Sequence, residues 1–170
     1  MFTRAGRAAI FDRKVYTEAF FDNDAMADSA IIVGLVGAAT YVGFLITGVF
    51  ARFELTNLLE IVLYSVVSWL ILGFATWFAA SRLFKASGRP QSLLAMQGLA
   101  VLPLLLEIFG SPLSWVGLIW YLVILVVATK EGSDLPYKQA SASVLIGFAA
   151  AFILRLLLGA PFALLSGALL

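Results

Sequence analysis

The stretch LTNLLEIVLYSVVSWLILGFATWFAA, residues 55–80, decides the fold, because its only charged side chain is Glu60. As an α-helix it would be about 39 Å long, enough to cross a hydrocarbon core of about 30 Å. Similar apolar runs occupy residues 29–51, 93–109, 113–129 and 140–158. The sequence therefore predicts an all-α, polytopic membrane protein, with five transmembrane helices between residues 29 and 158.

The composition supports a membrane protein. Hydrophobic residues make up 62% of the chain, charged residues make up 12%, and the mean hydropathy is +1.03, more than a soluble domain of 170 residues can bury. The chain has no Cys and no His, which excludes disulfides, thiolate or imidazole metal sites and axial haem ligands. We therefore expect no metal, no cofactor and no enzyme activity. A net charge of +1 without a broad basic patch argues against nucleic acid as a partner.

The positive charges are segregated along the chain. Nine of the eleven Lys and Arg residues lie in residues 1–28, 82–89 and 130–138, whereas Arg52 lies between two runs and Arg155 within the last one. Positively charged loops of membrane proteins stay on the cytoplasmic side. This pattern predicts an amino terminus in the cytoplasm and a carboxyl terminus outside.

Residues 1–28 precede the first apolar run and hold five acidic and four basic residues, so no cleavable signal peptide is visible. Ile10, Phe11, Val15 and Phe20 recur at roughly helical intervals among the charged residues. This spacing predicts a cytoplasmic, interfacial amphipathic helix. A frayed polar tail is the alternative.

The last residues are predicted to form an apolar tail. Gly159 and Pro161 are expected to end the fifth helix, which leaves residues 159–170 outside and too few to cross the membrane again. Such a tail lies in the outer interface or docks on a membrane-protein partner. The alternative is that lipid covers it.

Three ionisable residues fall within apolar runs, where a charge costs several kcal/mol unless it is paired or reaches water. They are Glu60, Glu107 and Arg155. Counted along the spans at about 1.5 Å per residue, Glu107 and Arg155 share a depth in the outer third of the bilayer. We predict a structural intramembrane ion pair between them, with Glu60 as the other candidate partner. An ion or proton site, and side chains that snorkel to the interface, are the alternatives.

Other residues are predicted to shape the helix packing. Small residues at four-residue spacing let helices approach closely, and they occur on the first and fifth spans at Gly34, Ala38, Ala39, Gly43, Ser143, Gly147 and Ala151. Pro103 removes a backbone hydrogen bond within the third span and is predicted to kink it. Trp69 and Trp120 lie deep in their spans and need partners for their indole N–H groups.

Three stretches carry a family resemblance. They are a basic turn that leads into the span with Pro103, written GRPQSLL at residues 88–94; GLIW at residues 117–120; and the turn from KE at residues 130–131 to KQA at residues 138–140. In this order the chain resembles the Yip family, five-span membrane proteins first known as partners of Rab-type GTPases. The resemblance runs from about Ile10 to Gly147. It implies a compact member in a bacterial inner membrane and carries over no catalytic residue.

The chain departs from the eukaryotic Yip proteins at its amino terminus. Those proteins carry a long cytosolic domain that engages GTPases, whereas only 28 residues precede the first predicted span here. This is too short for a domain, which puts GTPase binding in doubt.

Two classes of function compete. A Yip-like scaffold or organiser of the membrane would act through helix packing and its amphipathic amino terminus. An accessory subunit of a larger, energy-converting membrane complex would use this terminus and the apolar tail for docking. A transporter is a weaker hypothesis, because the spans carry only three charges and no internal repeat. The expected partners are the lipid bilayer and a membrane protein.

Overall fold

The computed structural model describes residues 2–22, 24–110 and 112–167, with side chains on the last helix described to Ile153 and at Leu156. These residues form helices only: α1 (Phe2–Ala9), α2 (Arg13–Phe21), α3 (Ala25–Ile46), α4 (Leu55–Phe84), α5 (Pro90–Leu99), the 3₁₀ helix η1 (Leu102–Phe109), α6 (Leu113–Ser133) and α7 (Tyr137–Gly167). The prediction of an all-α fold is confirmed.

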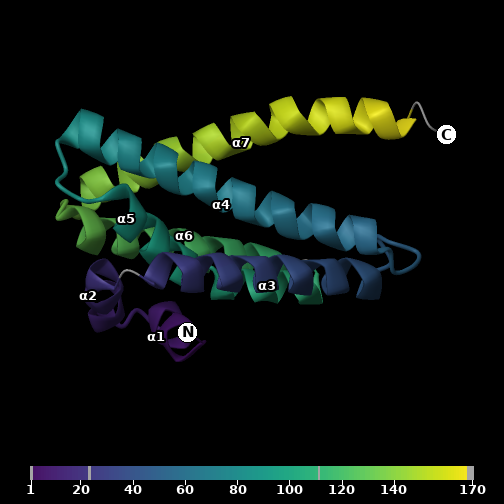
Figure 1. Cartoon of the computed structure of the whole chain (residues 1–170), viewed down its shortest axis with the longest axis horizontal. Helices are drawn as coiled ribbons and strands as arrows, with labels where there is room; N and C mark the ends of the chain where they lie inside the picture. Colours follow the sequence, from purple (N-terminus) through teal and green to yellow (C-terminus); the bar gives the residue numbers. More distant parts are fainter. Residues whose placement is uncertain (1, 23, 111, 168–170) are drawn as a thin grey trace.

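Five segments run back and forth along one axis: α3, α4, α5 with η1, α6 and α7 (Figure 1). Four of them are long and apolar enough to cross a membrane, namely Ala25–Ile46, Leu55–Phe84, Pro90–Phe109 and Leu113–Ser133. The part of α7 with described side chains, Tyr137–Ile153, is apolar but shorter than a span. The chain is thus an integral membrane protein by the length and composition of four helices, and the fifth predicted span is not confirmed.

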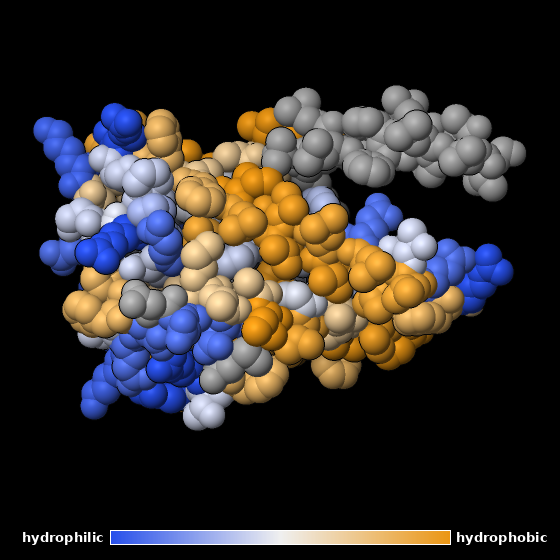
Figure 2. Space-filling model, in the orientation of Figure 1, coloured by the Kyte–Doolittle hydropathy of each residue, from blue (hydrophilic) through white to orange (hydrophobic). Residues whose placement is uncertain are grey.

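The two ends of the bundle carry the charges, and apolar side chains cover the middle (Figure 2). At one end, which we call the basic end, α4 and α6 finish and α5 and α7 begin; its cations are Arg82, Lys85, Arg89, Lys130 and Lys138. The other end, which we call the Arg52 end, includes the α3–α4 turn and the start of α6. This distribution fits a molecule whose middle contacts hydrocarbon and whose ends contact water.

The helix α5 forms the centre of the basic end. Residues 92–100 are all buried, and α5 packs against α2, α3, α4 and α6. Pro90 occupies the first turn of α5, where its missing N–H leaves no bond unmade. Because α5 is covered on every side, this part of the sequence is apolar without a polar face.

Four side-chain hydrogen bonds, each to a different neighbouring helix, hold α5 in place. They join Ser29 Oγ to the Ala95 carbonyl at 2.6 Å, Trp69 Nε1 to the Leu94 carbonyl at 3.1 Å, Gln97 Nε2 to Thr129 Oγ1 at 3.3 Å, and Ser92 Oγ to the Phe20 carbonyl at 3.3 Å. Such bonds between membrane helices contribute about 0.6 kcal/mol each on average. Trp69 therefore has the indole partner that the sequence required.

Pro103 divides the third span instead of only kinking it. The helix α5 ends at Leu99, and the chain resumes at Leu102 as the 3₁₀ helix η1. Pro103 has no N–H to donate to the Leu99 carbonyl. Ala100 and Val101 donate to carbonyls three residues back, which is the 3₁₀ pattern. The predicted kink therefore underestimated the change, and Glu107 lies on a helix of a different type from α5.

Several helices are longer than the sequence predicted. The helices α4 and α6 run one turn further toward the basic end and stop where Lys85 and Asp134 adopt left-handed conformations, with φ of 57° and 51°. A left-handed residue after the last turn is a common way to end a helix. The helix α3 is not longer than predicted but lies closer to the amino terminus, at Ala25–Ile46 instead of residues 29–51.

The prediction that Gly159 and Pro161 end the fifth helix was wrong. The helix α7 continues through both residues to Gly167. A proline removes one backbone hydrogen bond, whereas unwinding in an apolar setting would leave several backbone groups without partners. The predicted external tail, residues 159–170, is therefore helical as far as Gly167, and its side chains lie outside the described ones.

The amino-terminal segment is a pair of short helices and not one amphipathic helix. Phe11, with φ of 64°, turns the chain between α1 and α2. Asp12 then caps α2 by accepting a hydrogen bond from the Lys14 backbone N–H at 3.0 Å. The helix α2 packs against α5 and α6, and α1 packs against α5 and η1. The segment therefore covers the bundle and does not stand apart from it.

Candidate functional site

A cavity of about 400 Å³ lies among α3, α4, η1, α6 and α7. Its wall runs from Val33 to Phe44 on α3 and from Ile61 to Leu72 on α4. At about 1.5 Å per residue, each of these walls is about 16 Å long. The cavity is therefore elongated along the bundle axis, and it extends from the middle of the bundle toward the Arg52 end.

Polar groups gather in the half of the cavity nearer the Arg52 end. The Thr40 hydroxyl donates a hydrogen bond to Oε2 of Glu107 at 3.4 Å. On α4, the side chains of Tyr64 and Ser65 line this half, and Ser68 lies near the middle of the wall. The Ser65 hydroxyl donates to the backbone carbonyl one turn back at 2.8 Å. The other half of the wall is mostly apolar, formed by Val33, Trp69, Leu72, Val101 and Phe148.

Four helix pairs around the cavity touch at a glycine that leaves no room for a Cβ atom. They are α3 and α4 at Gly37, α3 and η1 at Gly43, α6 and η1 at Gly117, and α4 and α7 at Gly147. At Gly43, for example, a Cβ would lie 2.7 Å from the Ile108 Cα atom. Contacts this close fix the distances between backbones. The outline of the cavity is thus set by the backbone positions of five helices.

The small residues chosen from the sequence have different surroundings. Gly43 and Gly147 lie at these close contacts, whereas a Cβ at Gly34 would meet Val62 at an ordinary 3.7 Å. The others are Ala151, which lines the cavity, Ser143, which is buried, and Ala38 and Ala39, which are half-buried. Gly37 was missed because its neighbours at four-residue spacing, Val33 and Tyr41, are large. A search for single glycines would have found it.

The predicted intramembrane charges do not share one environment. Glu107 lines the cavity, whereas Glu60 is exposed and lies in a neighbouring groove, which shares Ile61 and Tyr64 with the cavity wall. The Arg155 side chain lies outside the described ones, so its ion pair with Glu107 stays a prediction. No group of three or more Asp or Glu residues that could hold a metal ion is present among the described residues.

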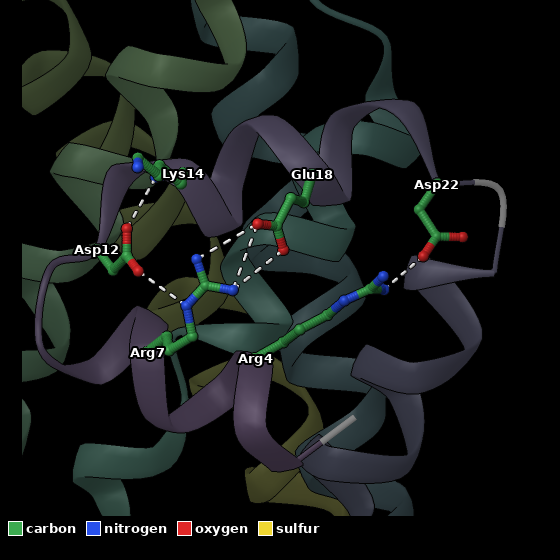
Figure 3. A network of polar contacts seen from close by, with 6 residues as sticks. All are labelled: Arg4, Arg7, Asp12, Lys14, Glu18 and Asp22. Atoms are coloured by element: carbon green, nitrogen blue, oxygen red, sulfur yellow. Dashed lines mark hydrogen bonds and ion pairs between the residues drawn. The ribbon is translucent and has the colours of Figure 1, made fainter.

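A second group of polar side chains joins α1 to α2 (Figure 3). Arg7 forms ion pairs with Asp12 at 2.8 Å and with Glu18 at 3.2 Å, and Arg4 forms one with Asp22. Hydrogen bonds from these arginines lower the pKa of the Asp12 and Asp22 carboxyl groups. The network holds the two helices against each other at their exposed side.

Other contacts attach this helix pair to the bundle. The Trp120 indole N–H donates to the Ala9 carbonyl at 3.1 Å, and an Arg13 N–H donates to the Tyr137 hydroxyl at 3.1 Å. The Tyr16 hydroxyl donates to the Ala8 carbonyl at 3.1 Å, and burial raises the pKa of this Tyr16 hydroxyl. Trp120 therefore has an indole partner, as the sequence required, on an element 111 residues away.

No protein-family model, curated protein or solved structure matches this chain. Two features bear on its function, the cavity and the attached amino-terminal helices. The cavity offers one carboxylate and several hydroxyl groups, which accept or donate hydrogen bonds, within a largely apolar wall. This combination is suited to binding, because ligand sites are mostly apolar with a few placed polar groups.

Proposed function

We propose that this chain is a non-catalytic, five-span membrane scaffold of Yip type, located in the inner membrane of a bacterium. Its basic end would face the cytoplasm, because positively charged loops stay on that side. The fifth crossing would be α7, whose 31 residues extend about 46 Å. The carboxyl terminus would then lie outside.

The attached amino-terminal helices carry this proposal. Ala5, Ala8 and Val15 are buried against the bundle or within the helix pair, whereas Phe2, Ile10 and Phe21 are 61%, 71% and 78% exposed. Because α1 and α2 are attached to the bundle, these apolar side chains are held in fixed positions beside basic residues. Apolar side chains next to cations suit the inner face of a membrane or the apolar surface of a partner. A scaffold acts by presenting such a surface.

An accessory subunit of a larger membrane complex, such as an energy-converting one, is the second candidate. The observation that favours it is a set of large exposed side chains at the Arg52 end, among them Phe109 and Trp115, which are 69% and 63% exposed. Together with the amino-terminal helices they give apolar contacts at two ends of the bundle. A neighbouring subunit would cover both.

Single-cysteine labelling tests the topology without any background, because the natural chain has no Cys. In intact cells, a membrane-impermeant maleimide is expected to label Ala51→Cys and a cysteine added after Leu170. It is expected to leave Ser87→Cys unlabelled until the cells are opened. If the added cysteine, like Ser87→Cys, were labelled only after the cells are opened, the number of crossings would be even. This result would refute the five-span topology.

Purification in a mild detergent, followed by identification of the bound proteins, separates the two candidates. If the chain is a scaffold, no protein is recovered at one copy per chain. Several proteins are recovered at less than one copy per chain, and their amounts decrease in the double variant Ile10→Ser with Phe21→Ser. Leu83→Ser is the matched control, since Leu83 is also an exposed apolar residue near the basic end. A partner recovered at one copy per chain favours the accessory subunit and refutes the scaffold. If the purified chain conducts ions in liposomes, the scaffold and the accessory subunit are both refuted.

A further inference from the structure

The cavity among α3, α4, η1, α6 and α7 has a polar half and an apolar half. The polar half, with Thr40, Tyr64 and Glu107, is nearer the Arg52 end, and the half with Val33 and Leu72 reaches the middle of the bundle. We propose that the cavity binds a single-chain amphiphile whose head group donates hydrogen bonds. This inference goes beyond the scaffold function and does not depend on it.

The size of the cavity fits one hydrocarbon chain. Its volume of about 400 Å³ lies within the range of about 300–1,000 Å³ that is usual for ligand pockets, and its walls on α3 and α4 are about 16 Å long. One extended hydrocarbon chain can lie along walls of this length. The rings of Trp69, Tyr121 and Phe148 line the walls around it.

Glu107 sets the chemistry of the head group. The oxygens of a carboxylate accept hydrogen bonds, and in a low-dielectric setting each donor that reaches them is worth more than in water. Thr40 donates to Oε2 over a long 3.4 Å. A protonated amine or a hydroxyl can donate to the same carboxylate and contact the hydroxyl of Thr40, which lies 3.4 Å from it. An ether has no hydrogen-bond donor, and neither has a carboxylate.

A ligand can reach the cavity from the side. Tyr64 and Phe152 both line the cavity, and they are 39% and 53% exposed. The wall formed by α4 and α7 therefore continues to the outer surface of the bundle. An amphiphile in the surrounding bilayer would enter there with its chain toward the membrane centre and its head toward the Arg52 end. This is the orientation of a lipid in the leaflet at that end.

Four probes with the same chain test the proposal: dodecylamine, dodecanol, dodecyl methyl ether and dodecanoate. The full chain is kept in micelles of dodecyldimethylamine oxide, whose head group accepts hydrogen bonds without donating them, and native mass spectrometry counts the bound probes. We expect one copy of the amine or the alcohol, bound at least tenfold more tightly than the ether or the carboxylate. Equal binding of alcohol and ether, or no saturation at one copy, would overturn the proposal.

Two variants connect the binding to the cavity. Glu107→Leu is expected to reduce binding of the amine and the alcohol at least tenfold, to the level of the ether. Glu60→Leu is the matched control, because Glu60 is another carboxylate within an apolar helix but lies outside the cavity. An unchanged preference for donors in Glu107→Leu would overturn the proposal. Ser68→Phe fills the cavity and must abolish binding of every probe. If Glu107→Leu is not recovered folded, Ser68→Phe alone tests whether the probes bind in the cavity.

Discussion

At the basic end, every residue of α5 from Ser92 to Leu99 is buried, whereas at the Arg52 end residues 104–108 of η1 are only half-buried beside a cavity. Both segments belong to the same predicted span, and both are surrounded by apolar helices. The difference is that α5 is held by side-chain hydrogen bonds from four elements. The chain therefore packs one half of its third span fully and leaves space beside the other.

The division at Pro103 allows this difference. A continuous α-helix would carry the close packing of α5 along the whole bundle, because its side chains would keep the same 3.6-residue period. The 3₁₀ helix η1 changes that period and directs its side chains differently. Glu107 can then lie in the wall of a cavity while Gln97, ten residues earlier, lies in a closed core. A site can thus be placed in a membrane bundle without weakening its best packed part.

The largest expected effect comes from shortening a side chain in each half. Leu94 is fully buried, so Leu94→Ala leaves a new cavity and is expected to lower the free energy of unfolding by about 2 kcal/mol. Leu104 already borders a cavity, so Leu104→Ala is expected to cost less than about half as much. Unfolding of the purified protein in mixed micelles by sodium dodecyl sulfate measures both. Equal losses would contradict the difference between the two halves.

Adding a methyl group to α3 tests the contacts that outline the cavity. Gly43→Ala places a Cβ 2.7 Å from the Ile108 backbone, so α3 and η1 must separate, at a cost of about 1–2 kcal/mol. Gly34→Ala is the control on the same helix, since its Cβ would meet Val62 at 3.7 Å. The same unfolding measurement is expected to show no loss for Gly34→Ala. A loss of similar size for both would mean that the contact at Gly43 does not fix η1.

A smaller effect is expected where α1 is attached. Trp120→Phe removes the hydrogen bond to the Ala9 carbonyl and should weaken the attachment by about 1 kcal/mol. With Ala8→Cys as a reporter, because Ala8 is fully buried, maleimide labelling at neutral pH should become about fivefold faster. Trp115→Phe is the control, since Trp115 is exposed. Unchanged labelling in Trp120→Phe would show that this bond does not hold α1.

The smallest effect concerns acid. The pKa values of Asp12 and Asp22 lie below the ordinary 3.8 because Arg7 and Arg4 bond to the charged carboxylates. A carboxyl group whose pKa is lowered by folding stabilises the folded state at pH values above its ordinary pKa. This stabilisation is lost as the pH falls through the pKa of the folded state. Attachment of α1 and α2 should therefore be constant between about pH 8 and pH 5 and weaken slightly below 3.8, since exposed ion pairs contribute little. Deuterium uptake by residues 2–21, corrected for intrinsic exchange, measures this. Loosening near neutral pH would contradict it.

Hydropathy predicted the apolar helices because it depends on residues close together in the sequence, and residues 55–80 are unambiguous in this respect. The position of the amino-terminal segment could not be predicted in this way. Val15, Tyr16 and Ala19 form an apolar face, and such a face has the same spacing whether it meets lipid or protein. Only the assembled bundle shows that this face covers α5 and α6.

The sequence singled out Glu107 but did not predict the cavity that Glu107 lines. Tyr64, Ser65 and Ser68 share one face of α4, but hydroxyl groups on apolar helices are common and often bond to their own backbone, as Ser65 does. A cavity results from the relative positions of five helices, which no single stretch of sequence encodes. A face with three hydroxyl groups opposite a lone carboxylate is the pattern that could have indicated it.

The attachment of α2 to α5 has a consequence for biosynthesis. The residues of α2 leave the ribosome about 70 residues ahead of the helix that they cover, so they must wait unattached until the third span has been inserted. A bulky domain fused to Met1 that kept α2 away would leave one flank of α5 open to other proteins in the membrane. Maturation of this protein is thus complete only when α2 has folded back onto a later helix.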